Sequence, residues 1–286
     1  MKIGVGLPAT VPDLSPEAVL DWAAGAEDYG FSTLGVLDRL AYQNYEPLVT
    51  LAAAAALTSH TALAATVLIA PYRQDVALLA KQAATVHELS GGRLTLGVSA
   101  GLREDDFAVS GAPFRGRGKR LDAMIETCHA VWAGEHPGPD NAVGPALRHG
   151  KPALMIGGNS EAALHRAARY GDGWVAGASS PAQYAKMLGT ARRIWAEHGR
   201  TEPLRTQAVA FFALGPDAES DAERYLRRYY AFLGPHSEMM LKKAATDEDR
   251  LAEVIDAYRQ AGCDELVFFP CSADIRQLDL LTKATR

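Results

Sequence analysis

The sequence predicts an α/β protein, specifically a (β/α)8 TIM barrel that forms a single domain over residues 1–286. Three observations support this prediction: eight short apolar segments recur along the chain, each is followed by a helical pattern, and few of them alternate strictly. Strands that are buried on both faces need no alternation, which favours parallel strands inside a ring of helices. An open, doubly wound sheet is the alternative, because the order of elements does not reveal closure.

The predicted elements follow one another in a regular order. We expect strands at residues 2–6, 33–37, 62–69, 94–98, 153–156, 173–176, 206–214 and 265–269. We expect helices at residues 16–29, 46–58, 76–89, 118–132, 160–169, 181–197, 218–230 and 246–260, and a last short helix from residue 273. The first helix has a clear start, since Ser15 is a favoured N-cap and Pro16 suits the first helical position. Two long connections, at about 134–152 and 232–247, should cover a site or lack fixed structure.

Composition argues against several classes of partner. A net charge of −5 and a pI near 5.9 argue against nucleic acid or an anionic membrane, which need concentrated lysine and arginine. The apolar stretch at 48–71 is interrupted by "TSHT", so it fits a helix, a turn and a strand better than a membrane span. The three cysteines lack a C-x-x-C spacing and the eight histidines are scattered, so we expect a cytoplasmic protein with no disulfides and no metal site.

The sequence "MIGGNS" at 155–160 joins a predicted strand directly to a predicted helix. In a barrel of this kind, the strand C-termini carry the chemistry and the helix N-termini bind phosphate. Gly157 and Gly158 would let an anion approach the backbone, and the helix dipole would add partial positive charge. One interpretation is a phosphate cradle that includes Asn159 and Ser160, and the other is a tight turn with Asn159 as the helix cap.

Three segments, at residues 68–101, 114–134 and 155–174, carry motifs in an order that is typical of one known family. The most specific motifs are "LAKQAAT", "LSGGRLTLGV" and "GGNSEAALHRAARYGDGW". On these motifs the chain resembles the bacterial luciferase-like family of FMN- or F420-dependent oxidoreductases over roughly residues 2–178. The resemblance implies a luciferase-like TIM barrel that binds FMN or the deazaflavin coenzyme F420 at its C-terminal mouth.

The resemblance also implies roles for residues near the reactive ring. The cofactor phosphate would lie on residues 157–160, and Asp38 matches the aspartate of an Asp-His pair that is common in the family. Arg39 replaces the histidine, and arginine cannot act as an acid or base near neutral pH. The candidate catalytic residues Asp38 and Arg39 would then orient the ring or the substrate, and Arg39 could stabilise a reduced anionic cofactor or a carboxylate. An ion pair that holds the loop is the alternative role of Arg39.

Two further strand ends carry candidate cofactor-binding residues. The resemblance implies that Thr66 and Val67 form a non-prolyl cis peptide bulge that supports the ring. Ser99 and Gly101 would lie at the mouth, near the polar edge of the ring. Asp105 could also reach the ring, but we expect it to form a solvated charge run with its neighbours Glu104 and Asp106.

Basic residues cluster at 115–120, at the start of a predicted helix. They could clamp an acidic substrate or the tail of a cofactor. Surface ion pairs with Asp122 or Glu126 are the alternative.

These observations predict an oxidoreductase that acts on a small organic substrate. With reduced FMN from a separate reductase it would be a monooxygenase, and with F420 it would be a hydride-transferring reductase or dehydrogenase. The alternatives are a phosphate-binding barrel isomerase or lyase and a non-catalytic flavin-binding protein, although no strand end carries the lysine that many such isomerases need. We expect no nucleic-acid or membrane partner, and the resemblance allows a homodimer.

Overall fold

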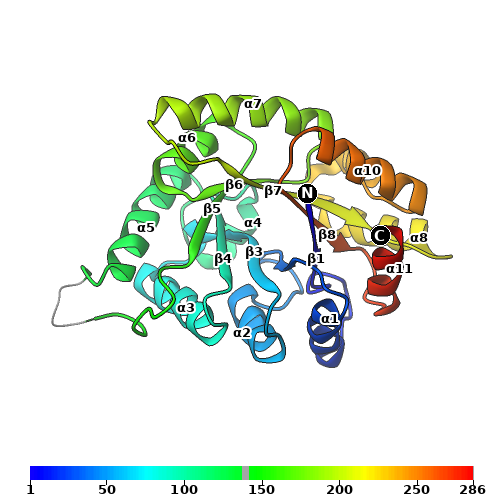
Figure 1. The fold of residues 1–286 in the computed structure, drawn as a ribbon, viewed down its shortest axis with the longest axis horizontal. Helices are drawn as coiled ribbons and strands as arrows, with labels where there is room; N and C mark the ends of the chain where they lie inside the picture. The colour runs from blue at the N-terminus through cyan, green and yellow to red at the C-terminus, as the bar shows by residue number, and fades with distance from the viewer. Residues whose placement is uncertain (137–141, 286) are drawn as a thin grey trace.

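The eight strands pair in sequential order and close into a barrel, because β1 pairs in parallel with both β2 and β8 (Figure 1). The computed structural model describes residues 1–136 and 142–285. The strands are β1 (Lys2–Gly6), β2 (Thr33–Val36), β3 (Ala62–Ile69), β4 (Leu94–Ser99), β5 (Ala153–Gly157), β6 (Gly173–Ala176), β7 (Arg205–Phe212) and β8 (Glu265–Pro270). Closure confirms the predicted (β/α)8 barrel and excludes the open sheet.

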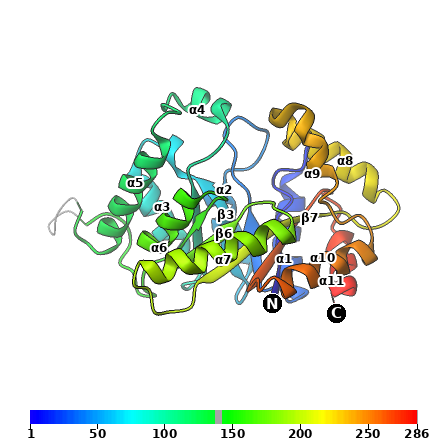
Figure 2. The same ribbon diagram turned by 90° about the horizontal axis from the view of Figure 1, so that it is seen from above.

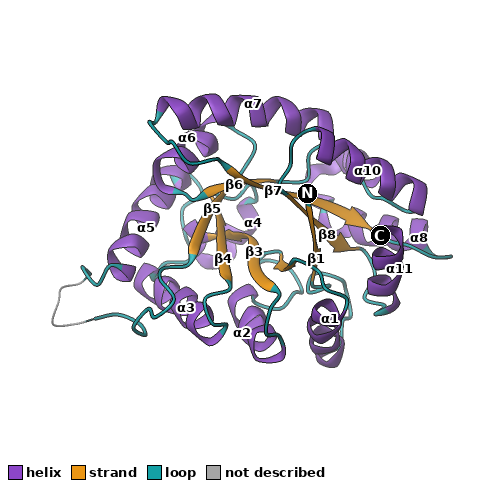
Figure 3. Ribbon diagram, in the orientation of Figure 1, coloured by secondary structure: helices purple, strands orange, loops and turns teal. Residues whose placement is uncertain are grey.

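Helices surround the barrel as a ring (Figure 3). The longer ones are α1 (Pro16–Asp28), α2 (Pro47–Leu57), α3 (Val76–Leu89), α5 (Arg117–Trp132), α6 (Glu161–Tyr170), α7 (Pro181–Glu197), α8 (Ala218–Tyr229), α10 (Glu248–Gln260) and α11 (Arg276–Thr285). Every predicted strand and helix is present, and the largest displacement is in the last helix, predicted from residue 273 and found from Arg276. In the described residues, no helix is both long enough and apolar enough to cross a membrane.

The sequence analysis missed shorter elements that follow β3, β4 and α8. They are η1 (Ala70–Tyr72), α4 (Glu104–Ser110), η2 (Ala231–Ser237) and α9 (Glu238–Leu241). The helix α4 occupies the expected solvated charge run, and η2 and α9 fill most of the predicted long loop at 232–247. The centre of the other long loop, residues 137–141, lies outside the described residues.

The barrel interior is packed with large side chains that need glycine beside them. A Cβ atom at Gly6 would lie 2.1 Å from the ring of Phe269, so only glycine leaves room for this aromatic side chain. Phe269 belongs to a buried cluster with Val175, Val209 and Phe211. These three cluster members also line a cavity, which places the cavity directly above the packed interior.

Glu27 on α1 caps the turn before β3. Its carboxylate accepts hydrogen bonds from the backbone N–H groups of Ser59, His60 and Thr61 at 2.6, 3.0 and 2.9 Å. Burial acts to raise the pKa of Glu27, but these backbone hydrogen bonds outweigh it and lower the pKa to about 2. Since the folded-state pKa lies below the unfolded value, the stabilisation is complete above about pH 5 and is lost as the pH falls towards 2.

We therefore expect Glu27→Gln to lower the free energy of unfolding by about 1–3 kcal/mol at pH 7. The difference from the wild type should shrink as the pH falls from about 5 towards 2, because protonation removes the same charge from the wild type. Urea unfolding of both proteins at several pH values measures this difference. A difference that stays constant over this range would contradict the role of the carboxylate.

Candidate active site

A cavity of about 590 Å³ opens at the C-terminal ends of the strands, a volume typical of small-molecule sites. Its lining residues come from the ends of β2 to β7 and from the helical segments α4, α5, α6, α8, η2 and α9. Figure 2 shows α4 and α9 at this end of the barrel, with the N-terminus at the opposite end. The cavity therefore lies where (β/α)8 enzymes carry their chemistry.

The cavity brings together every residue that the sequence analysis named as a candidate catalytic or cofactor-binding residue, whereas Asp105 and most of the basic residues at 115–120 do not line it. Its lining includes Asp38, Arg39, Thr66, Val67, Ser99, Gly101, Gly157, Gly158, Asn159 and Ser160. These residues come from four separate segments of the sequence. Their convergence supports a shared site, and their roles in binding and catalysis stay predictions.

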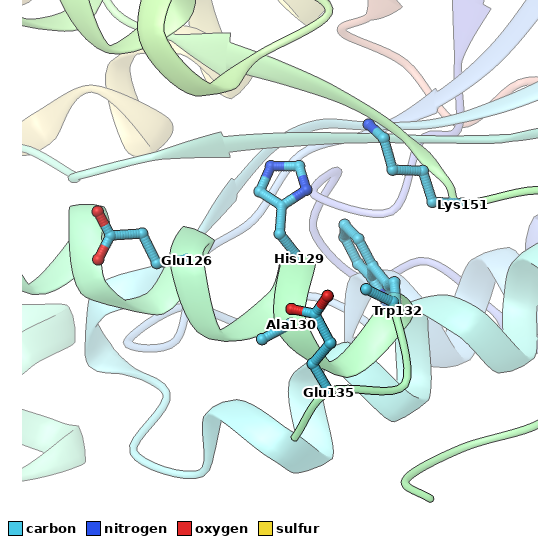
Figure 4. Close-up of a pocket in the computed structure, with 7 residues that line it drawn as sticks. Glu126, His129, Ala130, Trp132, Glu135 and Lys151 are labelled. Carbon is cyan, nitrogen blue, oxygen red and sulfur yellow. The ribbon is translucent and has the colours of Figure 1, made fainter. Parts of the chain in front are cut away.

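A second pocket has a volume of about 470 Å³, and Figure 4 shows residues that line it. It is lined by residues near the C-terminal end of α5, including Glu126 and His129, and by Lys151, which precedes β5. Helix C-termini and strand N-termini share the end of the barrel opposite the chemistry. Burial, and secondarily Lys151, lowers the pKa of His129, which therefore favours the neutral imidazole at pH 7.

Asp38 is buried in a network that joins the ends of β2 and β3. Its carboxylate accepts hydrogen bonds from the Ile69 N–H, the Tyr72 hydroxyl and Arg73 Nη1, each at 2.7 Å. Burial raises the pKa of Tyr72, and the neighbouring Asp38 carboxylate raises it further. Asp38 therefore fixes the loop after β3, and its oxygen atoms already have donors inside the protein.

Arg39 is held in a buried ion pair with Asp106 of α4. Its Nε lies 3.0 Å from Asp106 Oδ2, and the two side chains are only 4% and 3% exposed. The other carboxylate oxygen of Asp106 accepts the N–H groups of Leu40 and Ala41 at 2.9 and 2.7 Å. The expectation of a solvated charge run is therefore wrong for Asp106, because Arg39 and the loop after β2 provide buried partners. This geometry favours the ion pair that we considered as the alternative role of Arg39.

The peptide bond between Thr66 and Val67 is cis, which confirms the prediction of a non-prolyl cis bond here. The pairing of β3 with β4 is irregular at the same place, between Ala65 and Leu68. The Val67 side chain packs closely against β5, because a Cβ atom at Gly157 would lie 2.6 Å from Val67 Cγ1. Gly157 is therefore required by this packing, in addition to any role in approaching an anion.

The junction between β5 and α6 combines both interpretations of "GGNS". Ser160 is the N-cap, since its side chain accepts the Ala163 N–H at 3.3 Å, so the alternative of Asn159 as cap is wrong. Gly158 has a φ of +132°, its N–H donates to the Val175 carbonyl, and its own carbonyl accepts Trp174 Nε1. The first N–H groups of α6 remain directed out of the helix end, where an anion can approach them.

Three arginines add positive charge to the cavity wall, two of them beside α6. Arg117 lines the cavity, its Nε donates to the Gly101 carbonyl at 2.9 Å, and no carboxylate pairs with it within the described chain. Arg166 also lines the cavity and pairs with Asp122, and Arg103 contributes from the segment after β4. The alternative of ion pairs between residues 115–120 and Asp122 or Glu126 is therefore wrong, because Arg166 pairs with Asp122 and Arg169 pairs with Glu126. Arg103 and Arg166 had no recognisable signal in the sequence.

The opposite wall is apolar and aromatic, and the sequence analysis missed it. It is formed by Val209, Phe211, Tyr229, Tyr230, Phe232, Leu233 and Met240. The guanidinium of Arg103 stacks on Phe232, with its carbon atom 4.2 Å from the ring centroid, and links the two walls. The cavity therefore has a cationic end beside α6 and an apolar side beneath α8 and α9.

Comparison with known sequences identifies relatives over most of the chain. The model of the luciferase-like monooxygenase family matches residues 1–266. An uncharacterized protein of Mycobacterium tuberculosis is 30% identical over 218 residues, which cover 66% of this chain and 75% of the relative. An F420-dependent glucose-6-phosphate dehydrogenase of Nakamurella multipartita is 27% identical over 202 residues, covering 65% of this chain and 60% of that protein.

Solved structures share the complete fold. An F420-dependent secondary alcohol dehydrogenase superimposes with a TM-score of 0.82 at 20% identity and covers 100% of this chain and 99% of its own. The FMN-bound oxygenating constituent of 3,6-diketocamphane monooxygenase from Pseudomonas putida has a TM-score of 0.75 at 18% identity, with coverage of 99% and 97%. The family match confirms the resemblance seen in the sequence motifs, and the chain belongs to the luciferase-like monooxygenase family.

Proposed function

We propose that this protein is an F420-dependent oxidoreductase that transfers a hydride between the coenzyme and a small organic substrate. The observation that carries the proposal is the cationic end of the cavity, where Arg117 and Arg166 lie beside the N-terminus of α6. F420 carries a phosphodiester followed by a chain of carboxylates, and such a tail needs positive charge beyond a single phosphate site. Relatives that are named as F420-dependent enzymes support the same choice.

The residues of the cavity fit this coenzyme at both ends. The backbone at Asn159 and Ser160 would hold the phosphate, and Arg117 would hold a carboxylate of the tail. The apolar side chains of Val67 and Val175 would contact the deazaflavin ring. When bound, F420 supplies a two-electron hydride carrier, and the protein supplies binding, orientation and exclusion of water.

Reduced FMN is the second candidate, because an FMN-bound monooxygenase shares the fold. FMN ends at one phosphate and has no further anionic tail. It would use the end of α6 but would leave Arg117 without a ligand partner. The two cofactors therefore differ in how far their binding depends on Arg117.

Titration of the purified protein with F420 and with FMN, followed by absorbance and fluorescence, tests the proposal. We expect F420 to bind with a Kd below about 100 μM, equivalent to roughly 5.5 kcal/mol, and more tightly than FMN. Arg117→Ala should weaken F420 binding about tenfold, through loss of a charge-assisted contact. Lys119→Ala is the matched control, because Lys119 is an exposed cation on the same turn of α5. Tighter binding of FMN, or equal losses in both variants, would contradict the proposal.

A further inference from the structure

Tyr229, the last residue of α8, has a hydroxyl group that the protein does not use. The residue lines the cavity and is 8% exposed. In the part of the chain that the structure describes, its hydroxyl makes no hydrogen bond, whereas those of Tyr225 and Tyr258 each have a partner at 2.7 Å. The hydroxyl groups of Tyr42 and Tyr184 are buried without a partner, whereas that of Tyr229 is not closed off in this way and belongs to a residue on the cavity wall. It is therefore open to a partner that enters the cavity.

The ring of Tyr229 is held on several sides by aromatic neighbours. It stacks on Tyr225 with ring centroids 5.6 Å apart, and it meets the edges or faces of Tyr42 and Tyr230 at 5.5 and 5.1 Å. The Arg103 guanidinium also donates to the backbone carbonyl of Tyr229 at 3.2 Å. A side chain restrained in this way presents its hydroxyl with little further loss of entropy when a ligand binds.

Burial keeps the Tyr229 hydroxyl protonated, and therefore a hydrogen-bond donor, at neutral pH. Burial raises the pKa of Tyr229 above its ordinary value, and Arg39 partly offsets this effect. The guanidinium carbon of Arg39 lies 6.0 Å from the centroid of the Tyr229 ring. Arg39 cannot give up a proton at neutral pH, so the neighbouring hydroxyl is the group that can. The positive charge of Arg39 would also stabilise the phenolate left after a proton transfer.

We propose that the Tyr229 hydroxyl binds and protonates the oxygen of a carbonyl substrate, so that the substrate pair is a small ketone or aldehyde and its alcohol. This inference rests on the proposed function, which supplies the hydride. The apolar wall that contains Phe211, Leu233 and Met240 would accept the substituents of the carbonyl carbon. The substrate class is therefore a carbonyl compound with apolar substituents.

The reaction balances with reduced F420 as the reductant. The carbonyl carbon gains a hydride, which forms a C–H bond and breaks the C=O π bond, and the oxidised deazaflavin is left. The carbonyl oxygen gains the proton of Tyr229, and the phenolate recovers a proton from water at the cavity mouth. In the reverse direction the phenolate accepts the alcohol proton as the hydride leaves carbon.

Binding of isobutyramide, an unreactive carbonyl compound, to the F420-loaded protein tests the hydrogen bond directly. We expect Tyr229→Phe to weaken isobutyramide binding about five- to tenfold in calorimetry while the Kd for F420 is unchanged. Tyr42→Phe is the matched control, since Tyr42 packs on the same ring and does not line the cavity. The inference would be overturned if isobutyramide did not bind the F420-loaded wild type. It would also be overturned if isobutyramide bound F420-loaded Tyr229→Phe as tightly as the wild type.

Reduction of a panel of short ketones and aldehydes by reduced F420 tests the proton transfer. For Tyr229→Phe we expect kcat to fall about 100-fold or more with a much smaller change in KM, as for loss of a general acid. Tyr42→Phe should stay within about twofold of the wild type. No turnover with any member of the panel, or an equal fall in both variants, would overturn the inference. Failure of F420 itself to bind would instead overturn the proposed function, which the titration detects separately.

Discussion

Gly158→Asp is expected to weaken binding of the phosphate-bearing cofactor at least 100-fold. The substitution would place a carboxylate at the junction where the N-terminus of α6 meets the cavity, and a negative charge there opposes a phosphate. A 100-fold loss corresponds to about 2.7 kcal/mol, which is within the range expected for a close pair of like charges in a partly buried site. The effect should apply to F420 and FMN alike, because both present a phosphate.

Backbone strain must be separated from charge in this experiment. Gly158 has a φ of +132°, and a Cβ atom there would lie 3.0 Å from that of Ala163, so any side chain at this position is strained. Gly158→Asn has nearly the same shape without the charge and is the matched control. We expect Gly158→Asn to bind the cofactor much more tightly than Gly158→Asp when both proteins are folded by circular dichroism. Undiminished cofactor affinity in folded Gly158→Asp would exclude a phosphate at this junction.

Arg39→Met is expected to lower the free energy of unfolding by about 3–5 kcal/mol. The substitution preserves much of the side-chain volume but leaves the carboxylate of Asp106 buried without its cation. The N–H groups of Leu40 and Ala41 still donate to that carboxylate, so the site should fold but become less stable. Urea unfolding at pH 7 measures the change.

A double-mutant cycle identifies the charge as the cause. Asn at position 106 keeps an oxygen atom for the two N–H groups but carries no charge, so Arg39→Met combined with Asp106→Asn should recover part of the loss. The coupling energy between the two positions should reach 1–3 kcal/mol. If Arg39→Met lowers the free energy of unfolding by less than about 1 kcal/mol, the buried pair behaves like an exposed ion pair. The same conclusion follows if the effects of the two substitutions on that free energy simply add.

The sequence was sufficient to predict the barrel, because its eight strands and their helices each leave a local pattern of apolar residues and caps. The resemblance to the luciferase-like family named most of the candidate residues at strand ends, and they meet at one cavity because parallel strands in a closed barrel end at the same rim. The cap of α6 was misassigned by one residue, because Asn159 and Ser160 are both good N-cap residues. The structure separates them, because the Ser160 side chain accepts the Ala163 N–H and its backbone is extended at φ −116°.

The missed features depend on contacts between distant segments. The helix α4 has only 7 residues, too few to show a helical period, although its three acidic residues suit a helix N-terminus. Burial of Asp106 depends on Arg39, which lies 67 residues earlier in the chain. The aromatic wall at Tyr229 and Phe232 forms because α8, η2 and α9 pack beside the cavity. A local sequence pattern predicts a helix but does not predict which part of the barrel the helix packs against.

The buried pair of Arg39 and Asp106 also makes these two positions interdependent. Exchange of either residue alone for an uncharged one leaves the other charge buried without its counter-charge. A histidine at position 39 beside Asp106 is the milder single exchange, since histidine can lose or gain its proton. The two positions therefore form one unit, and any redesign of this rim of the cavity has to change them together.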